Sequence, residues 1–269
     1  MGFFGRKRAP SVPHPRKEPR FDGPLTLERL EQIFQDCVDF TKRPVSLGEG
    51  GACTLTLCYL SGMVKMERVS DYVLRPLAQD EALARCGTPR QAMDRMKDGA
   101  LYNLSAEERT RLDAAVFDLV NGCCLLLFPG ESSVLSLNVG TEEKRSISSP
   151  SNETVLKGSR DAFVEGLRTN TSIVRRHLKA PELRIREQVV GRQSVTSVDI
   201  LYIEGLTNPH LVEQVAAQLA DIDIDAVLAT GNIEEYIVPA ARTAFPLVQY
   251  TERSDRFCAC LLYTSPSPR

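Results

Sequence analysis

The sequence has no tryptophan, only three histidines and no two cysteines in the C-x-x-C spacing. Its eight cysteines therefore lack the arrangement with which two neighbouring thiolates usually hold a zinc ion. Cys58, Cys123 and Cys124 lie inside apolar runs, where a thiol behaves as a small hydrophobic side chain. We expect no metal site, and thiols that stay reduced in a reducing compartment.

Long apolar runs are also missing. No stretch reaches the roughly 18 consecutive apolar residues that a membrane-spanning helix needs, and the longest run, residues 123–128, has the length of a strand. The opening residues MGFFGRKRAP lack the apolar centre of a signal peptide. We expect the residues given to form a soluble piece of protein.

Charge of one sign is not in excess, since 33 Lys and Arg stand against 35 Asp and Glu. Such a balance gives no field that would attract nucleic acid, so we expect no nucleic-acid partner. His14, His177 and His210 do not stand in any motif that pairs a nucleophile with a base, which disfavours a hydrolase. What remains is a globular chain of 269 residues, 42% hydrophobic, long enough for one or two domains.

Two ligand-binding motifs are incomplete. The glycine-rich residues 48–51 lack the Gly-Lys-Ser/Thr end of a phosphate loop, and they precede a strand where such a loop would follow one. Asp221, Asp223 and Asp225 alternate with isoleucines, but the Gly and Glu of a calcium loop are absent at the required offsets. We therefore expect neither a nucleotide nor a calcium ion, and no other cofactor.

The sequence predicts a tail at its start and helices and strands after it. Residues 1–24 are basic and rich in proline, which predicts a disordered tail that is either a solubilising leader or a weak anchor for anionic lipid. Thr26 can cap a helix continuing to Phe40, and Ser105 can begin a helix reaching Asp118. Residues 123–128 and 134–139 predict a hairpin around a Pro-Gly turn. Asn208 followed by Pro209 predicts another helix start, with Leu211, Val212, Val215 and Leu219 facing a core.

A short motif occurs twice, as YLSGM at residues 59–63 and YIEGL at residues 202–206. In each copy an amphipathic helix is expected before the strand (residues 27–40 and 163–178) and another after it (residues 64–77 and 209–219). This repetition predicts an α/β fold of two tandem similar subdomains, residues 25–145 and 146–261. Each would be a small mixed β-sheet flanked by helices.

Residues 158–178 fit the pattern GxRxxFxExLxxNxxxxRRxL, through Gly158, Arg160, Phe163, Glu165, Leu167, Asn170, Arg175, Arg176 and Leu178. Four further blocks follow: Gly191 with Ser194 and Thr196; residues 202–205 with Asn208 and Pro209; Gly231 with residues 233–235; and residues 245–246 with 251–255. In this order the blocks resemble the GerA family of spore germination proteins, most strongly over residues 145–257. Ser254 departs from the family, which usually has proline there.

The resemblance implies the soluble N-terminal part of a germinant receptor A subunit, truncated before its membrane region. Such a subunit oligomerises in the spore inner membrane, works with B and C subunits and passes ions when a nutrient binds. The domain lies on the cytoplasmic side, where it assembles the complex and relays its state, and it is not an enzyme. Residues 262–269 resemble translated adapter sequence and are expected to be an unstructured foreign tail. A free-standing two-lobed small-molecule binding protein is the alternative.

Residues 158–178 also support a prediction that does not depend on the family resemblance. Phe163, Leu167, Asn170, Val174 and Leu178 predict one helical stripe, in which Asn170 must find a neighbouring backbone partner. Arg168, Arg175 and Arg176 lie off that stripe. We expect them to form an ion-pair seam between subdomains or subunits with Glu204, Glu234, Glu252 and Asp255, or else to be solvated. The candidate interface or structural residues are Arg160, Glu165, Asn170, Arg175, Arg176, Glu204, Asn208, Glu252, Arg253 and Asp255.

Overall fold

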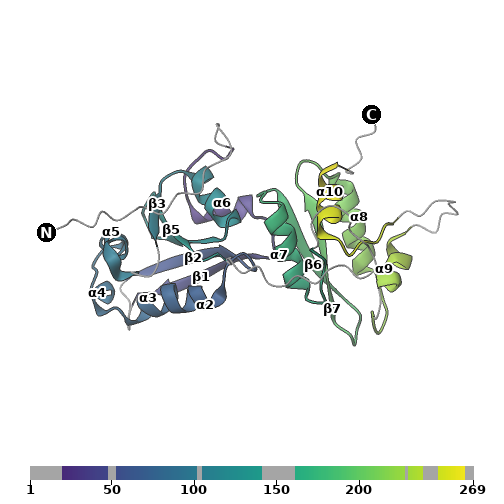
Figure 1. Cartoon of the computed structure of the whole chain (residues 1–269), viewed down its shortest axis with the longest axis horizontal. Helices are drawn as coiled ribbons and strands as arrows, with labels where there is room; N and C mark the ends of the chain where they lie inside the picture. Colours follow the sequence, from purple (N-terminus) through teal and green to yellow (C-terminus); the bar gives the residue numbers. More distant parts are fainter. Residues whose placement is uncertain are drawn as a thin grey trace. The chain divides into compact units, whose positions relative to one another are not determined.

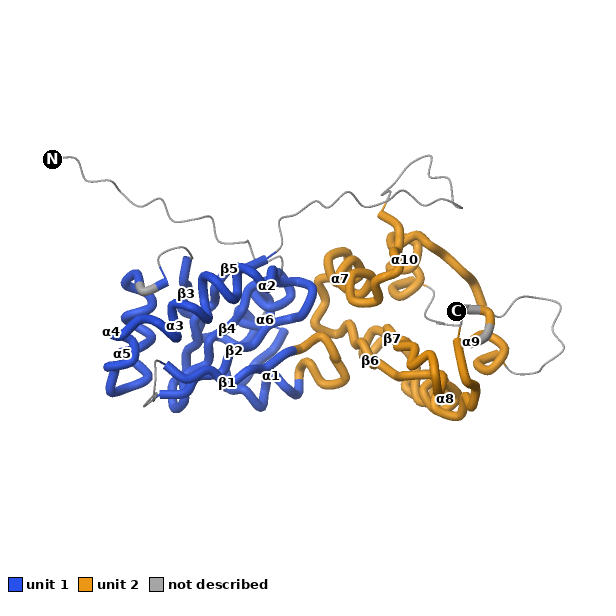
Figure 2. Tube along the Cα trace, turned by 90° about the horizontal axis from the view of Figure 1, so that it is seen from below, with its two compact units in different colours: residues 1–32, 41–141 blue, residues 33–40, 142–269 orange. Residues whose placement is uncertain are grey.

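The computed structural model describes residues 20–47, 53–101, 105–140, 161–227, 230–238 and 248–263. The chain divides into two compact units, residues 1–32 with 41–141 and residues 33–40 with 142–269 (Figure 2). The predicted α/β class is confirmed. The predicted succession of subdomains differs in one respect, because residues 33–40 belong to the second unit while both their flanks belong to the first.

The first unit contains a five-stranded sheet in the order β1-β2-β4-β5-β3. Its strands are β1 (Phe40–Ser46), β2 (Thr54–Leu60), β3 (Ala106–Arg109), β4 (Cys123–Leu127) and β5 (Val134–Asn138). The pairings of β2 with β4, β4 with β5 and β3 with β5 are all antiparallel, where a mixed sheet was expected. The predicted hairpin is confirmed as β4 and β5, with Gly130 at φ +77° in its turn.

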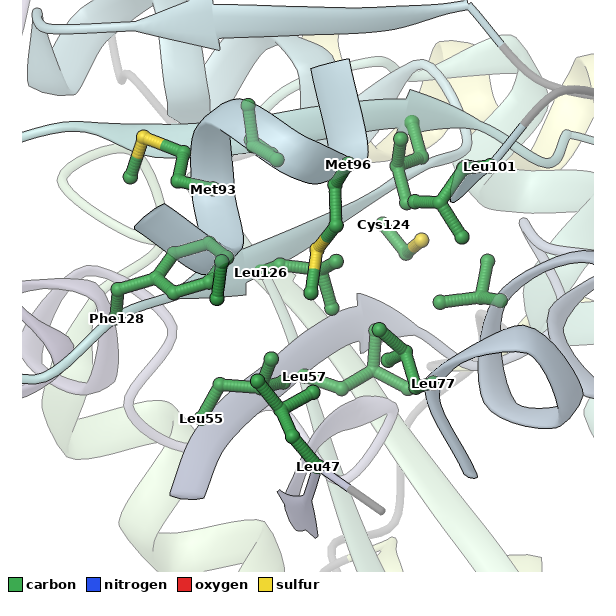
Figure 3. Packing of buried hydrophobic residues seen from close by; sticks show 14 of the residues in the cluster. Leu47, Leu55, Leu57, Leu77, Met93, Met96, Leu101, Cys124, Leu126 and Phe128 are labelled. Carbon is green, nitrogen blue, oxygen red and sulfur yellow. The ribbon is translucent and has the colours of Figure 1, made fainter. Parts of the chain in front are cut away.

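Helices cover this sheet on both faces (Figure 1). They are α1 (Leu27–Ile33), α2 (Met66–Val69), the π-helical η1 (Ser70–Leu74), α3 (Arg75–Gln79), α4 (Glu81–Ala84), α5 (Pro89–Arg95), η2 (Met96–Ala100) and α6 (Leu112–Val120). Leu57 and Leu126 pack with Leu77 and Met93 in one apolar cluster, drawn in Figure 3, while α6 contacts β2 to β5 outside that cluster. Alternate strand residues thus supply two apolar faces.

Two predicted helices are wrong in part, for tertiary reasons. The helix expected to reach Phe40 ends at Ile33, and Asp36 takes φ +57°, a left-handed conformation that stops a helix. The helix expected from Ser105 begins only at Leu112, because residues 106–109 pair with β5 as the edge strand β3. In both places pairing with a distant strand overrides a local helical pattern.

The second unit is built on a hairpin of β6 (Leu183–Val190) and β7 (Thr196–Ile203), which pair in antiparallel register. On one face lie α7 (Leu167–His177) and α10 (Ser254–Tyr263), with Val174, Leu183, Ile203 and Cys258 in a shared core. On the other face lie α8 (Pro209–Ala220) and α9 (Thr230–Ile237). Cys37 adds an isolated parallel bridge to Ile185 at the outer edge of β6.

The repeated sequence motif marks a shared turn rather than a shared sheet. Gly62 and Gly205 both follow a strand and both take a left-handed conformation, at φ +82° and +77°. The sheets differ in size, five strands in the first unit and two in the second among the described residues. The Asn208 cap is confirmed, since its side chain accepts from the His210 amide at 3.0 Å. The predicted core face is confirmed at Val212, Val215 and Leu219, whereas Leu211 is 45% exposed and does not face a core.

The chain ends lie largely outside the described residues. Residues 1–19 of the predicted tail and residues 264–269 of the predicted foreign segment belong to that part. Leu262 and Tyr263, which we expected to be unstructured, form the last turn of α10. Of the helices described, none combines the length and apolar character needed to cross a bilayer.

A polar network closes the outer edge of the first unit's sheet and predicts an acid-sensitive stability. Glu108 on β3 accepts hydrogen bonds from Lys97, Ser133 and Arg90 at 2.6, 2.7 and 2.8 Å, and these lower its pKa to about 2. A carboxyl whose folded pKa is depressed stabilises the fold above its unfolded pKa, about 4.3, and loses that contribution as pH falls through the folded value.

We therefore expect Glu108→Gln to lower the melting temperature at neutral pH by a few degrees, and this deficit to shrink as the pH falls from about 4.3 towards 2. Thermal unfolding followed by circular dichroism at several pH values measures it. Glu81→Gln is the control, because the exposed Glu81–Arg85 pair on α4 should contribute little. A deficit independent of pH would contradict the prediction.

Candidate functional site

Helix α7 places two arginines over the β6–β7 hairpin. Arg168 and Arg175 are seven residues apart, so they lie on one face of the helix two turns from each other. Beneath them are Asp39, Glu187 and Asp199, which we call the acid row. Glu187 and Asp199 are direct cross-strand partners, and Asp39 stands two residues beyond the Cys37–Ile185 bridge, level with Glu187. Three adjacent segments thus each supply one carboxylate.

Arg175 and Asp39 form a buried, two-pronged ion pair. Arg175 Nε donates to Asp39 Oδ2 at 2.8 Å and Nη2 donates to Oδ1 at 3.0 Å, with only 1% and 2% of the side chains exposed. The guanidinium also donates to the Ala180 carbonyl at 3.3 Å. Burial disfavours the charge, yet the hydrogen bonds to Asp39 outweigh it and the pKa of Arg175 is raised. Arg175 therefore stays charged and hydrogen-bonded.

This ion pair holds the segment of residues 33–40 on the second unit. Val38 N donates to Ile185 O at 3.0 Å, and Ile185 N donates to Asp36 O at 3.1 Å, as in a parallel sheet. Arg184 Nη1 donates to the Ile33 carbonyl. Residues 33–40 therefore form part of the second unit, although the residues before and after them in the sequence belong to the first.

Arg168 serves two carboxylates at the other end of the acid row. Its Nη2 contacts Glu187, and its Nη1 lies 3.4 Å from Asp199 Oδ2. The Asp199 side chain is only 1% exposed, and its Oδ1 atom is buried without a hydrogen-bond partner among the described residues. Burial raises the pKa of Asp199, Arg168 opposes the rise, and Glu187 and Asp39 add to it.

A second polar cluster joins two of the family's sequence blocks. Residues 161–163 pair with residues 252–254, through Phe163 N to Glu252 O at 2.8 Å and a bridge between Ala162 and Arg253. The Ser254 hydroxyl donates to the Asp161 carbonyl at 3.0 Å. This cluster fixes the start of α10 beside the end of α7.

The same cluster brings a serine, a histidine and an aspartate together, but not as a hydrolase arranges them. His177 Nε2 lies 3.2 Å from Ser254 Oγ and 3.5 Å from Asp161 Oδ2, so both partners meet the same ring nitrogen. In a catalytic triad they meet opposite nitrogens. Ser254 is also fully buried. The geometry suits a structural tie.

Most predicted site residues have local structural roles. Asn170 is confirmed in its tie to the backbone, since it accepts from Val164 N at 2.8 Å and donates to Val164 O at 2.6 Å. The predicted helix, however, starts at Leu167, so Phe163 lies ahead of it. Glu165 and Arg176 are exposed, while Glu252 is half-buried. Arg160 lies outside the described residues.

The ion pairs expected from the sequence have different partners. Arg175 pairs with Asp39 and Arg168 with Glu187 and Asp199, so the predicted pairing of these two arginines with Glu204, Glu234, Glu252 and Asp255 is wrong. Asp255 instead pairs with Arg253 at 2.6 Å, and Glu204 lies 3.6 Å from Arg184. Arg176 interacts electrostatically with Asp161, and burial lowers its pKa.

Sequence reasoning missed Asp39 and Asp199. Asp39 falls in a stretch whose spacing fits a helix, and Asp199 breaks an otherwise apolar strand, TSVDILYI. The position of Asp199 between Val198 and Ile200 was a usable signal, because an acidic residue among apolar strand residues needs a partner or a proton when it is buried.

Comparison with known proteins gives consistent matches. The model of one family, described as Bacillus/Clostridium GerA spore germination protein, matches residues 28–263. Among curated relatives, the uncharacterized membrane protein YfkQ of Bacillus subtilis is 33% identical over 88% of this chain and 45% of its own length. Spore germination protein KA of Bacillus subtilis is 31% identical over 83% of this chain and 40% of its own. The chain thus spans less than half of these relatives.

A solved structure matches along nearly the same extent. It is the N-terminal domain of the A subunit of the Bacillus megaterium spore germinant receptor GerK3, with a TM-score of 0.66 and 25% identity. The match covers 88% of this chain and 86% of that one. The two folds therefore correspond over most of both chains.

The buried ion pair predicts a large loss of stability when one partner is removed. Arg175→Met leaves Asp39 buried and unpaired, which should cost about 3–5 kcal/mol in urea-induced unfolding. Replacing both residues, Arg175→Met with Asp39→Leu, should recover much of that loss, because no unpaired charge remains. Arg176→Met, one position along α7 and exposed, is the matched control. Equal losses at positions 175 and 176 would contradict this assignment.

Proposed function

Because the chain belongs to the Bacillus/Clostridium GerA family of spore germination proteins, we propose that it serves as the N-terminal domain of a germinant receptor A subunit. The observation that carries the proposal is the correspondence of fold with the GerK3 A-subunit domain across most of both chains. The full-length protein would then stand in the spore inner membrane, with this domain on the cytoplasmic side and the membrane region following it.

The domain's part in that protein is assembly and relay rather than chemistry. It would help A subunits oligomerise and meet B and C subunits, so that nutrient binding leads to ion passage. One feature supports this role. Ser254 and Asp161 both meet Nε2 of His177, so this cluster ties α7 to the start of α10.

The predicted interface residues divide by exposure. Arg175 is buried, and Asn170, Glu252, Arg253 and Asp255 are partly buried in contacts within the second unit. These five residues hold the domain's own fold. Four others have exposed side chains: Glu165, Arg176, Glu204 and Asn208. We propose that the exposed set contributes to the surface between subunits, with Arg176 as its main cation.

Charge reversal at Arg176 tests this function in a full-length gene. We expect Arg176→Glu to reduce the amount of A subunit that co-purifies with other A subunits and with B and C subunits, and to slow nutrient-triggered germination. The reason is that an acid at this position repels the carboxylates that the arginine would meet. Unchanged thermal unfolding of the isolated chain would show that the fold survives.

Arg85→Glu provides the control, because Arg85 is also exposed but lies at the end of α4 in the first unit. Complexes and germination that are unaffected by Arg176→Glu would remove Arg176 from the proposed interface. Stabilisation of the chain by amino acids or sugars in a thermal-shift assay would instead favour a small-molecule binding protein.

A further inference from the structure

The charges beneath α7 do not balance. The acid row has three carboxylates, Asp39, Glu187 and Asp199, and α7 brings only two guanidinium groups to it. Arg175 is paired with Asp39 through two hydrogen bonds, from Nε and from Nη2. Arg168 is therefore left to serve Glu187 and Asp199 together, and one negative charge has no matching cation among the residues that the structure describes.

The excess charge falls on Asp199. Arg168 contacts Glu187 more closely than Asp199, whose nearer oxygen is 3.4 Å away, close to the limit of a hydrogen bond. The other oxygen of Asp199 is buried without a partner among the described residues, and the side chain is 1% exposed. Glu187, by contrast, is 24% exposed and reaches water. An ionised carboxylate in the position of Asp199 carries a large desolvation cost.

The strand register adds repulsion. Glu187 and Asp199 are direct cross-strand partners, and two like charges in that position destabilise a sheet. Where two carboxylates share one site, the usual resolution is that one of them keeps a proton. The distances fit that state, because a neutral Asp199 leaves Arg168 to pair mainly with Glu187, as observed.

We propose that Asp199 is a proton-binding site, in which one proton taken from solvent is held on the Asp199 carboxyl opposite the Glu187 carboxylate. Binding forms one O–H bond on Asp199, removes one negative charge from the acid row and needs no other reactant. The ligand is a proton rather than a larger cation, because the unpartnered oxygen is closed to solvent. The described residues also contain no cluster of three acids, cysteines or histidines arranged for a metal.

In the described part of the chain, the charged groups around Asp199 come from a small number of elements. Helix α7 contributes Arg168 and, beside Asp39, Arg175; β6 contributes Glu187; the segment of residues 33–40 contributes Asp39. In α10, Asp255 is engaged by Arg253. On the opposite face of the hairpin, Glu213 of α8 pairs with Arg186. Burial raises the pKa of Asp199, Arg168 opposes this, and Glu187 and Asp39 reinforce it.

The site makes the second unit sensitive to pH in a defined direction. A carboxyl whose folded pKa is raised contributes most stability below its unfolded pKa, about 3.9, and that contribution is lost as the pH rises through the folded value. Release of the proton leaves two carboxylates competing for Arg168 beneath α7. The expected consequence is a looser attachment of α7 to the hairpin at the higher pH.

Carboxyl titration by NMR tests the site directly in the 269-residue chain labelled with ¹³C-carboxyl aspartate. We expect the midpoint of Asp199 to lie above that of the exposed Asp221. Glu187→Gln should lower the Asp199 midpoint, because it removes the opposing like charge, and Arg168→Met should raise it. Glu213→Gln, on the other face of the hairpin, should leave it unchanged. An Asp199 midpoint at or below that of Asp221, or one that Glu187→Gln does not lower, would overturn the proposal.

Asp199→Asn supplies a second measurement, since the amide keeps the shape of the protonated acid. We expect this variant to be at least as stable as the parent at neutral pH. The parent should become less stable as rising pH removes the proton from Asp199, and the variant should not show this decrease. If the fold instead requires an ionised Asp199, Asp199→Asn would be less stable than the parent at neutral pH. If Asp199→Asn does not fold, the shift of the Asp199 midpoint by Glu187→Gln still decides the question.

Discussion

The second unit depends on one buried ion pair, Arg175 with Asp39. A two-stranded hairpin alone is a marginal structure, and here a third segment lies along its outer edge, held by backbone hydrogen bonds to Ile185 and by the pair of Asp39 with Arg175 beneath α7. The pair also fixes the position of α7, since the same guanidinium reaches the Ala180 carbonyl beyond the helix end. The segment of residues 33–40 and the loop at Ala180 are thus both hydrogen-bonded to Arg175 of α7. Such a pair is specific because any other register would leave a charge buried and unpaired.

The apolar cores are arranged around this constraint. In the first unit, alternate residues of β2, β4 and β5 form two faces and helices cover both, which is a self-sufficient layered design. In the second unit the apolar clusters are smaller, and each side of the hairpin is covered by two helices. Polar contacts therefore carry more of the specificity there, through Asn170, Ser254 and the acid row.

The sequence was informative where structure is local. The hairpin of β4 and β5, the cap at Asn208 and the backbone tie of Asn170 all follow from neighbouring residues, and they are confirmed. The sequence predicted the wrong structure where pairing with a distant strand determines it. Residues 34–40 and 106–109 have a helical pattern but do not form a helix. The partners of Arg168 and Arg175 could not be foreseen, because Asp39 is 136 positions from Arg175 and no local pattern links them.

The placement of residues 33–40 bears on how the chain is made. This segment leaves the ribosome well before its hydrogen-bond partner Leu183, which follows Cys37 by 146 positions. The second unit therefore remains incomplete until synthesis has passed α7 and β6, while the first unit can already fold on both sides of an unpaired strand. Contacts so distant in sequence form slowly, and an unpaired strand invites pairing with a neighbouring chain. Correct folding of this protein would then require that residues 33–40 do not pair with another chain before β6 has been synthesised.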